Sequence, residues 1–361
     1  MAAKGLYLHI GLPKTGTTFL QSLLAENRPR LREAGFIYPF VRKEGMFHAA
    51  VEVRGDHERW GLDPVVIEGS WQALIDKAEA FDGTAVISHE ILAGATTQQV
   101  ERVGVSLRGV DLHLVVTARD PARQVVAHWQ EAVKNGQTFS FADFTREVLR
   151  EDGAPDSELW NEQDLLGVLD RWGAVVPPDH LHLVPCPPDG ADRELLWQRF
   201  ADATGVPVGL TVTEEGRANE SLGLAQVHLL RRVNAELDGR IAQPTYAHVV
   251  KRYFAQRVLS EMSGERPVAP ESLREPLTEL ARTWVEEVSR RGYTVHGDLS
   301  DLVPTRFGDK HPDDVGEPSD IPPVALAALL ERIAELRLKL ETAPAPQPSR
   351  RIRRKLWEYR S

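Results

Sequence analysis

The chain of 361 residues is long enough for one large α/β domain or two modest ones. Hydrophobic residues make up 42% of it and charged residues 27%, which is typical of a globular protein in water. The formal net charge of -10 argues against a nucleic-acid surface and against long polyanionic substrates.

The cysteine count and the hydropathy pattern favour a cytoplasmic protein. Cys186 is the only cysteine, so no disulfide can form within the chain and a reducing compartment is expected. No run of about 18 apolar residues occurs, so we expect no transmembrane segment. A cleaved signal peptide would remove the most informative motif of the chain, so we expect none.

Short apolar runs alternate with helical patterns in the first two thirds of the chain, which predicts an α/β fold with a central, mostly parallel sheet. The predicted strands are 6–12, 84–88, 111–119 and 180–187. The predicted helices are roughly 17–26, 69–81, 97–108, 121–135, 140–151, 161–173 and 190–204.

The pattern becomes helical after about residue 210, so we predict four parts: an α/β core (1–210), a helical layer packed on it (211–300), an exposed linker rich in Pro, Gly and Asp (301–321), and a C-terminal helix with a basic tail (322–361). The last helix carries a stripe of leucines, which predicts either pairing with a second copy of the chain or folding back on the body. The basic tail predicts contact with an anionic membrane surface or, more simply, a solvated segment.

The first predicted strand runs into the sequence "IGLPKTGTTFL" (10–20), which resembles a phosphate-binding loop with its lysine displaced. A Walker A loop has Lys and Ser/Thr directly after its second glycine, where this chain has Thr17 and Thr18. A strand, a loop with Gly16 and a helix beginning near Thr17 still form an anion site, because the first backbone N–H groups of a helix have no partner in the helix. We expect the hydroxyls of Thr15, Thr17 and Thr18 at the mouth of this site.

Lys14 lies inside the loop, where its ammonium can neutralise a bridging oxygen as the bond to that oxygen breaks. This arrangement suits transfer of a sulfuryl group, which carries less negative charge than a phosphoryl group and needs no metal ion. The motif "LPKTGTT" is similar to the 5′-phosphosulfate loop of sulfotransferases that use 3′-phosphoadenosine-5′-phosphosulfate. The resemblance extends over roughly residues 5–240 and is nearest to the bacterial, actinobacterial-type branch. It implies a P-loop NTPase-like three-layer fold, sulfotransferase activity and this sulfuryl donor.

The predicted strand 84–88 is followed by His89 and Glu90, which offer a base for an acceptor hydroxyl. The resemblance implies a catalytic base just past this strand. Histidine has the more suitable ordinary pKa, and Glu90 would need burial to raise its own, so the residues leave the choice open. Glu90 as a simple helix cap is the alternative. His48 is expected to be a core histidine.

Arg119 ends the strand 111–119 and precedes Asp120 and Pro121, a favourable start for the next helix. The resemblance implies that Arg119 binds the 3′-phosphate of the donor. The family's serine is replaced by Ala127, so Arg123 or Gln124 is expected to compensate. Further along this helix we expect a surface pair between residues 131 and 134, and the alternative is that this face borders the acceptor pocket. Arg217, Asn219 and Ser221 form a weaker candidate for the 3′-phosphate or for a helix cap.

The sequence thus predicts a sulfotransferase that acts on a hydroxyl of a carbohydrate, lipid or small metabolite. Lys14, His89 and Glu90 are the catalytic candidates, and the donor is expected on Lys14, Thr15, Gly16, Thr17, Thr18, Arg119 and Arg123. The alternatives are a P-loop-type nucleotide kinase or other phosphotransferase, and a non-catalytic nucleotide-binding scaffold.

Overall fold

The computed structural model describes residues 5–149, 158–209, 221–314 and 322–342. Its centre is a sheet of six strands in the order β2-β3-β1-β4-β5-β6, and every neighbouring pair is parallel. The strands are β1 (Gly5–His9), β2 (Phe36–Ile37), β3 (Thr84–Ser88), β4 (Asp111–Ala118), β5 (Leu181–Pro185) and β6 (Thr294–Val295). Because the strands are parallel, all their carboxyl ends meet at one edge of the sheet.

Helices cover both faces of this sheet, since alternate residues of each strand face opposite sides and both sets are apolar. One face packs against α3 (Gly45–Arg54), α5 (Ser70–Glu79), α6 (Thr97–Ser106), α10 (Leu165–Gly173) and α13 (Arg274–Arg291). The other face packs against α1 (Thr17–Glu26), α2 (Arg28–Glu33) and α11 (Arg193–Thr204). The predicted α/β class with a P-loop-like three-layer arrangement is therefore confirmed.

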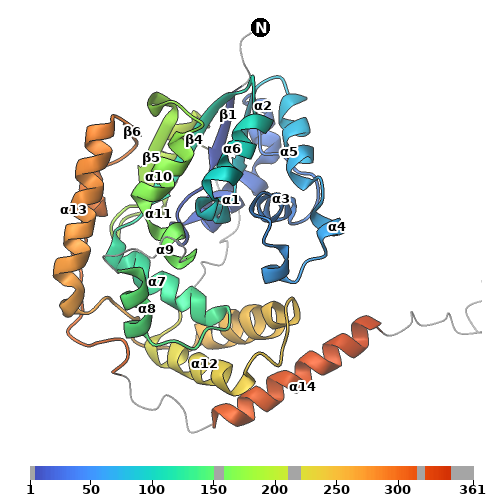
Figure 1. Cartoon of the computed structure of the whole chain (residues 1–361), viewed down its shortest axis with the longest axis vertical. Helices are drawn as coiled ribbons and strands as arrows, with labels where there is room; N and C mark the ends of the chain where they lie inside the picture. Colours follow the sequence, from blue (N-terminus) through green and yellow to red (C-terminus); the bar gives the residue numbers. More distant parts are fainter. Residues whose placement is uncertain (1–4, 150–157, 210–220, 315–321, 343–361) are drawn as a thin grey trace, which may run out of the picture.

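A second apolar cluster is mainly helical and lies below the sheet in Figure 1. It is built from α7 (Pro121–Lys134), α8 (Phe141–Val148), α12 (Leu224–Leu237), the π-helix η4 (Ala247–Val258) and α14 (Pro323–Thr342). α14 packs against α12 and η4 and buries Ala327, Leu330 and Ala334. Of the two alternatives for the last helix, folding back on the body is the one observed in this chain.

Several elements differ from the sequence predictions. The helices α2, α3 and α4 (Pro64–Ile67) were not predicted in the connection between the first two predicted strands. β2 and β6 were not predicted, because two-residue edge strands are too short to show an alternating pattern. The helix predicted over 161–173 is two helices, α9 (Glu158–Gln163) and α10, because the backbone of Asp164 is extended between them. β6 also joins a late segment of the chain to the sheet, directly after α13.

The described part of the predicted linker is packed against the helical cluster. The carboxylate of Asp313 accepts hydrogen bonds from the backbone N–H groups of Phe141 and Ala142, each at 2.9 Å, at the start of α8. Gly308 pairs with Pro270 in a short bridge. Segment 307–314 thus packs at the edge of the helical cluster, whereas Leu302 is buried in the apolar cluster against the sheet. The basic tail lies outside the described residues.

Candidate active site

The loop between β1 and α1 has three residues in left-handed backbone conformations, Gly11 (φ 40°), Lys14 (φ 68°) and Gly16 (φ 87°). A Cβ on Gly11 would lie 2.7 Å from Thr17 Cγ2, and a Cβ on Gly16 would lie 2.5 Å from Leu196 Cδ2. Both positions therefore require glycine for packing as well as for backbone conformation.

Gly16 is the N-cap residue of α1, and no side chain of the described residues caps this helix. The N–H groups at the start of α1 are therefore open to an anion, as the loop motif predicts. Thr18 is exposed, whereas Thr15 and Thr17 are buried. The Thr15 hydroxyl donates to Leu12 O at 2.7 Å, so it stabilises the loop itself. The mouth of the site is therefore formed by backbone N–H groups and the side chain of Thr18.

The ammonium of Lys14 turns toward α7 and pairs with the carboxylate of Glu131 at 3.0 Å. The same carboxylate also lies 3.6 Å from Lys134 Nζ and 2.7 Å from Lys251 Nζ on η4. Three ammonium groups share one carboxylate, so this cluster carries a surplus of positive charge beside the start of α1. The predicted surface pair of residues 131 and 134 is in fact part of this partly buried cluster.

The pKa shifts within this lysine cluster follow from its burial and charge. Burial raises the pKa of Glu131, but Lys14, Lys251 and Lys134 outweigh it, so that its pKa lies well below the usual carboxyl value. Burial lowers the pKa of Lys134 to about 8, although Glu131 opposes this shift. Glu131 is thus a firmly charged partner of the lysines and a poor proton acceptor.

Arg119 lies at the carboxyl end of β4, and β4 is the direct neighbour of β1 in the sheet. Its Nη2 donates to the backbone oxygen of Arg123 at 2.9 Å, whereas its Nε is buried without a hydrogen-bond partner among the described residues. A buried N–H group of this kind is costly unless it is paired, so Arg119 has a donor to offer an anion.

Arg123 is already engaged by protein groups. Its guanidinium pairs with Asp120, donates to Pro187 O at 3.0 Å and contacts Asp189 at 3.1 Å. Asp120 in turn caps α7 by accepting from the backbone N–H of Arg123, as the sequence predicts. Arg123 therefore braces the turn between β4 and α7.

His89 and Glu90 follow β3, the other neighbour of β1, so they lie on the same sheet edge as the loop. His89 Nδ1 accepts from the backbone N–H of Ile91 at 3.4 Å and caps the short helix η2 (Glu90–Gly94). In this tautomer the proton of the neutral ring is on Nε2. Glu90 Oε2 accepts from Gln21 of α1 at 3.1 Å and lies 3.9 Å from His89 Nδ1.

Burial raises the pKa of Glu90, but His89, the Glu90 backbone N–H and the Gln21 amide outweigh it and lower the net pKa. Burial also lowers the pKa of His89. At neutral pH the pair is therefore a neutral imidazole and a charged carboxylate. The carboxylate, with 27% of its side chain exposed, is the more accessible group of the pair, but the raised pKa that a glutamate base was expected to need is not found.

A chain of hydrogen bonds beneath the loop was missed by the sequence analysis. His9 Nδ1 lies 2.8 Å from Ser88 Oγ, and His9 Nε2 lies 3.1 Å from Thr117 Oγ1. Thr117 Oγ1 lies 2.6 Å from Thr15 Oγ1. The chain thus joins β3, β1 and β4 to the loop. Its only signal in the sequence is a polar residue near the end of each apolar strand.

Two other donors hold or surround the loop. Gln124 of α7, expected from the sequence as a possible donor to the 3′-phosphate, donates instead to the backbone oxygen of Pro13. Lys251 reaches the lysine cluster from η4, more than two hundred residues beyond the loop, and also donates to Asn135 Oδ1 at 2.7 Å. His48 is buried in α3, as predicted. Arg217 and Asn219 lie outside the described residues, and Ser221 is exposed.

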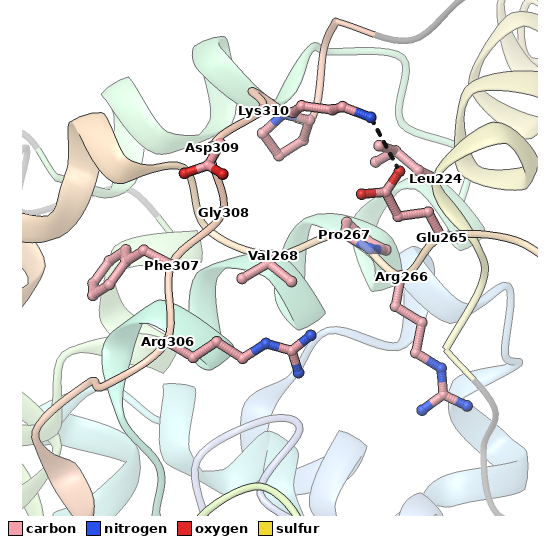
Figure 2. A pocket seen from close by; sticks show the side chains of 11 residues that line it. Leu224, Glu265, Arg266, Pro267, Val268, Arg306, Phe307, Gly308, Asp309 and Lys310 are labelled. Atoms are coloured by element: carbon pink, nitrogen blue, oxygen red, sulfur yellow. Dashed lines mark ion pairs between the residues drawn. The ribbon is translucent and has the colours of Figure 1, made fainter.

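A cavity of about 520 Å³ lies beside Leu224, the first residue of α12 (Figure 2). It is lined mainly by residues 265–268 and 306–310, and Lys310 pairs with Glu265 at 3.7 Å across it. Asp189 connects it to the candidate site, because this carboxylate contacts both Arg306 (3.7 Å) and Arg123. None of the residues predicted to bind the donor or to act in catalysis lines this cavity.

A comparison with solved structures finds one similar chain. No protein-family model matches the chain, and no curated protein matches it. The crystal structure of a sulfotransferase from Alicyclobacillus acidocaldarius is similar over 68% of this chain and 100% of that chain, with 15% sequence identity and a TM-score of 0.38. At this identity and TM-score the similarity is weak and supports no functional conclusion.

Proposed function

We propose that the protein is a sulfotransferase that transfers a sulfuryl group from 3′-phosphoadenosine-5′-phosphosulfate to a hydroxyl group of a carbohydrate, lipid or small metabolite. The observation that carries the proposal is the surplus of positive charge beside the uncapped start of α1, where Lys14, Lys134 and Lys251 share Glu131. A bound anion of two or more charges would balance this surplus.

The residues present fit both anionic ends of this donor. The 5′-phosphosulfate would lie on the loop from Lys14 to Thr18, where the N–H groups of α1 and the Lys14 ammonium serve as donors. The 3′-phosphate would take the unpartnered Nε of Arg119. Because Arg123 is engaged by Asp120 and Asp189, we assign it to positioning the Arg119 turn rather than to direct binding.

In the proposed reaction the acceptor oxygen forms a bond to sulfur and the bond between sulfur and the 5′-phosphate oxygen breaks. The Lys14 ammonium stabilises the negative charge that develops on this departing oxygen. We assign the acceptor proton to Glu90, because His89 Nδ1 is occupied by the Ile91 N–H and its other nitrogen carries a proton.

A nucleotide kinase is the less favoured alternative. It would need a lysine where Thr17 lies and a strand-end aspartate for Mg²⁺. Asp120 is at a strand end, but its two oxygens are occupied by the backbone N–H and the guanidinium of Arg123.

The loop and Arg119, which make up the proposed donor site, lie within the predicted core 1–210. Among the described residues no helix has the length and apolar character to cross a bilayer.

The experiment that tests the proposal is thermal unfolding of the full chain with adenosine 3′,5′-bisphosphate and, separately, with ATP and Mg²⁺. A ligand that binds the native state raises the unfolding midpoint by mass action. We expect the bisphosphate to raise it and Arg119→Met to remove most of that effect, whereas the control Lys310→Met keeps it. A larger effect of ATP with Mg²⁺ would contradict the proposal.

A further inference from the structure

Six histidine and aspartate side chains form a connected cluster at the opposite, amino edge of the sheet, far from the proposed active site in the topology. Asp111 and His113 begin β4, His180 ends the short helix η3 (Pro178–His180), His182 lies in β5, His296 follows β6, and Asp202 is on α11. Asp111 and His113 are two residues apart on one strand, so they face the same side.

Hydrogen bonds connect three of the imidazoles in a row that ends on Asp202. Asp202 Oδ2 lies 2.6 Å from His296 Nδ1, and His296 Nε2 lies 3.0 Å from His182 Nδ1. His182 Nε2 lies 2.9 Å from His113 Nδ1. A carboxylate only accepts, so each neutral ring donates toward Asp202 through its Nδ1–H. The proton pattern therefore leaves His113 Nε2 as a lone pair.

That lone pair faces a second acceptor. His113 Nε2 lies 3.6 Å from Asp111 Oδ2, so a nitrogen lone pair and a carboxylate oxygen oppose each other without a proton between them. His180 Nδ1 lies 3.0 Å from the backbone oxygen of Leu112 and 3.6 Å from Asp111 Oδ1. When this Nδ1–H donates to Leu112, the lone pair of His180 Nε2 is also free.

We propose that Asp111, His113 and His180 bind a divalent transition-metal ion of the Zn²⁺ type. One ligand atom of each residue lies within 4.8 Å of the others. His113 has its Nδ1 held by an acceptor of the protein, as metal-binding histidines usually do. Two imidazoles and one carboxylate are a ligand set that suits Zn²⁺ and disfavours Mg²⁺ or Ca²⁺, which prefer oxygen ligands.

Binding requires a modest rearrangement that the exposure of the site permits. The rings of His113 and His180 are stacked nearly parallel, with centroids 4.1 Å apart and an interplanar angle of 10°, so their in-plane lone pairs converge on one ion only after His180 turns. Their ligand atoms would then lie about 3.4 Å apart around tetrahedral Zn²⁺. The side chains of Asp111, His113 and His180 are 43%, 17% and 28% exposed, so His180 can turn and water can occupy the fourth position. The ion would then tie η3 to the first residues of β4. This inference does not depend on the proposed function.

The test is zinc binding to the untagged, metal-free full chain at pH 7.5, measured by titration calorimetry. We expect one Zn²⁺ per chain, and a loss of affinity of at least about tenfold in Asp111→Asn and in His180→Gln. Asp202→Asn, which changes only the far end of the histidine row, should weaken binding by about tenfold. His248→Gln on η4 is the matched control and should leave the affinity unchanged.

A second measurement keeps the proposal testable if a variant fails to fold. Co²⁺ added to the unmodified chain should give the intense visible d–d absorption of four-coordinate nitrogen and oxygen ligation, and Zn²⁺ should displace it. Absence of zinc binding, an unchanged affinity in Asp111→Asn and His180→Gln, equal binding of Mg²⁺, or weak six-coordinate Co²⁺ bands would each overturn the proposal.

Discussion

Lys14 combines two unusual features in one residue, a left-handed backbone and a partly buried ammonium. A non-glycine residue with positive φ costs roughly 1–2 kcal/mol, so the loop adopts this conformation only because its surroundings enforce it. The conformation turns the side chain toward Glu131 and the start of α1. The sequence pattern places this lysine in the loop, but its partner on α7 is a matter of tertiary structure.

We predict that Lys14→Ala lowers turnover by about 10²–10³-fold while the fold survives. Glu131 keeps Lys134 and Lys251 as partners, so the carboxylate is not left unpaired. Turnover of labelled sulfuryl donor with a mixture of hydroxyl acceptors measures the effect, and circular dichroism checks the fold. Lys310→Met is the control for loss of a remote positive charge. A Lys14→Ala protein with unaltered turnover would show that the ammonium has no catalytic role.

Glu90 and His89 can be separated by two conservative variants. Glu90→Gln removes the proposed proton acceptor and is expected to lower turnover by about 10²–10⁴-fold. His89→Asn keeps a side chain able to cap η2 and is expected to stay within about tenfold of the parent protein. Both are measured at saturating donor. If His89→Asn loses as much activity as Glu90→Gln, the histidine is the base and our assignment is wrong.

At the scale of elements, the strand order β3-β1-β4 brings the three functional segments together. Neighbouring strands lie about 4.8 Å apart, so the loop after β1 is flanked by His89 on one side and Arg119 on the other. The sequence predicts each segment as a strand end, and it predicts Asp120 and Pro121 as the start of α7. It cannot predict the buried chain of His9, Ser88 and Thr117, because such contacts depend on the register between strands.

We predict that Thr117→Val lowers the free energy of unfolding by about 1–3 kcal/mol, because it leaves the buried Nε2 of His9 without its partner. The loop also loses the contact of Thr15 with β4, so the affinity for adenosine 3′,5′-bisphosphate should fall. Urea unfolding and calorimetry measure the two effects. Thr283→Val on the exposed side of α13 is the matched control, expected within about 0.5 kcal/mol. Equal stability of the two variants would contradict a structural role for this chain.

At the scale of the whole molecule, buried neutral histidines make stability depend on pH. Burial lowers the pKa of His9 and of His128 to about 4, from an unfolded value near 6.5. The stability that these two neutral histidines contribute is fully present above pH 6.5. It is lost as the pH falls toward 4, since the unfolded chain then binds more protons than the folded chain. Each should lower the free energy of unfolding by up to about 1.4 kcal/mol per pH unit in this range.

This prediction is checked by urea unfolding at pH 7.0, 6.0 and 5.0. The variant His128→Asn should have a smaller slope of stability against pH than the parent chain, whatever its absolute stability. A parent protein equally stable at pH 7.0 and 5.0 would refute the assignment of these two histidines as neutral in the folded state.

The sequence by itself determined the local features of this protein: the strands of the sheet centre, the loop with Lys14 and Gly16, and the N-cap of α7. These depend on side-chain periodicity and on backbone preferences of nearby residues. Only the tertiary structure decided that Lys251 joins Lys14 around Glu131, that Arg119 keeps an unpartnered Nε, and that four histidines meet at the amino edge. Such contacts join residues that are distant in the chain, and they depend on strand order, strand register and helix packing.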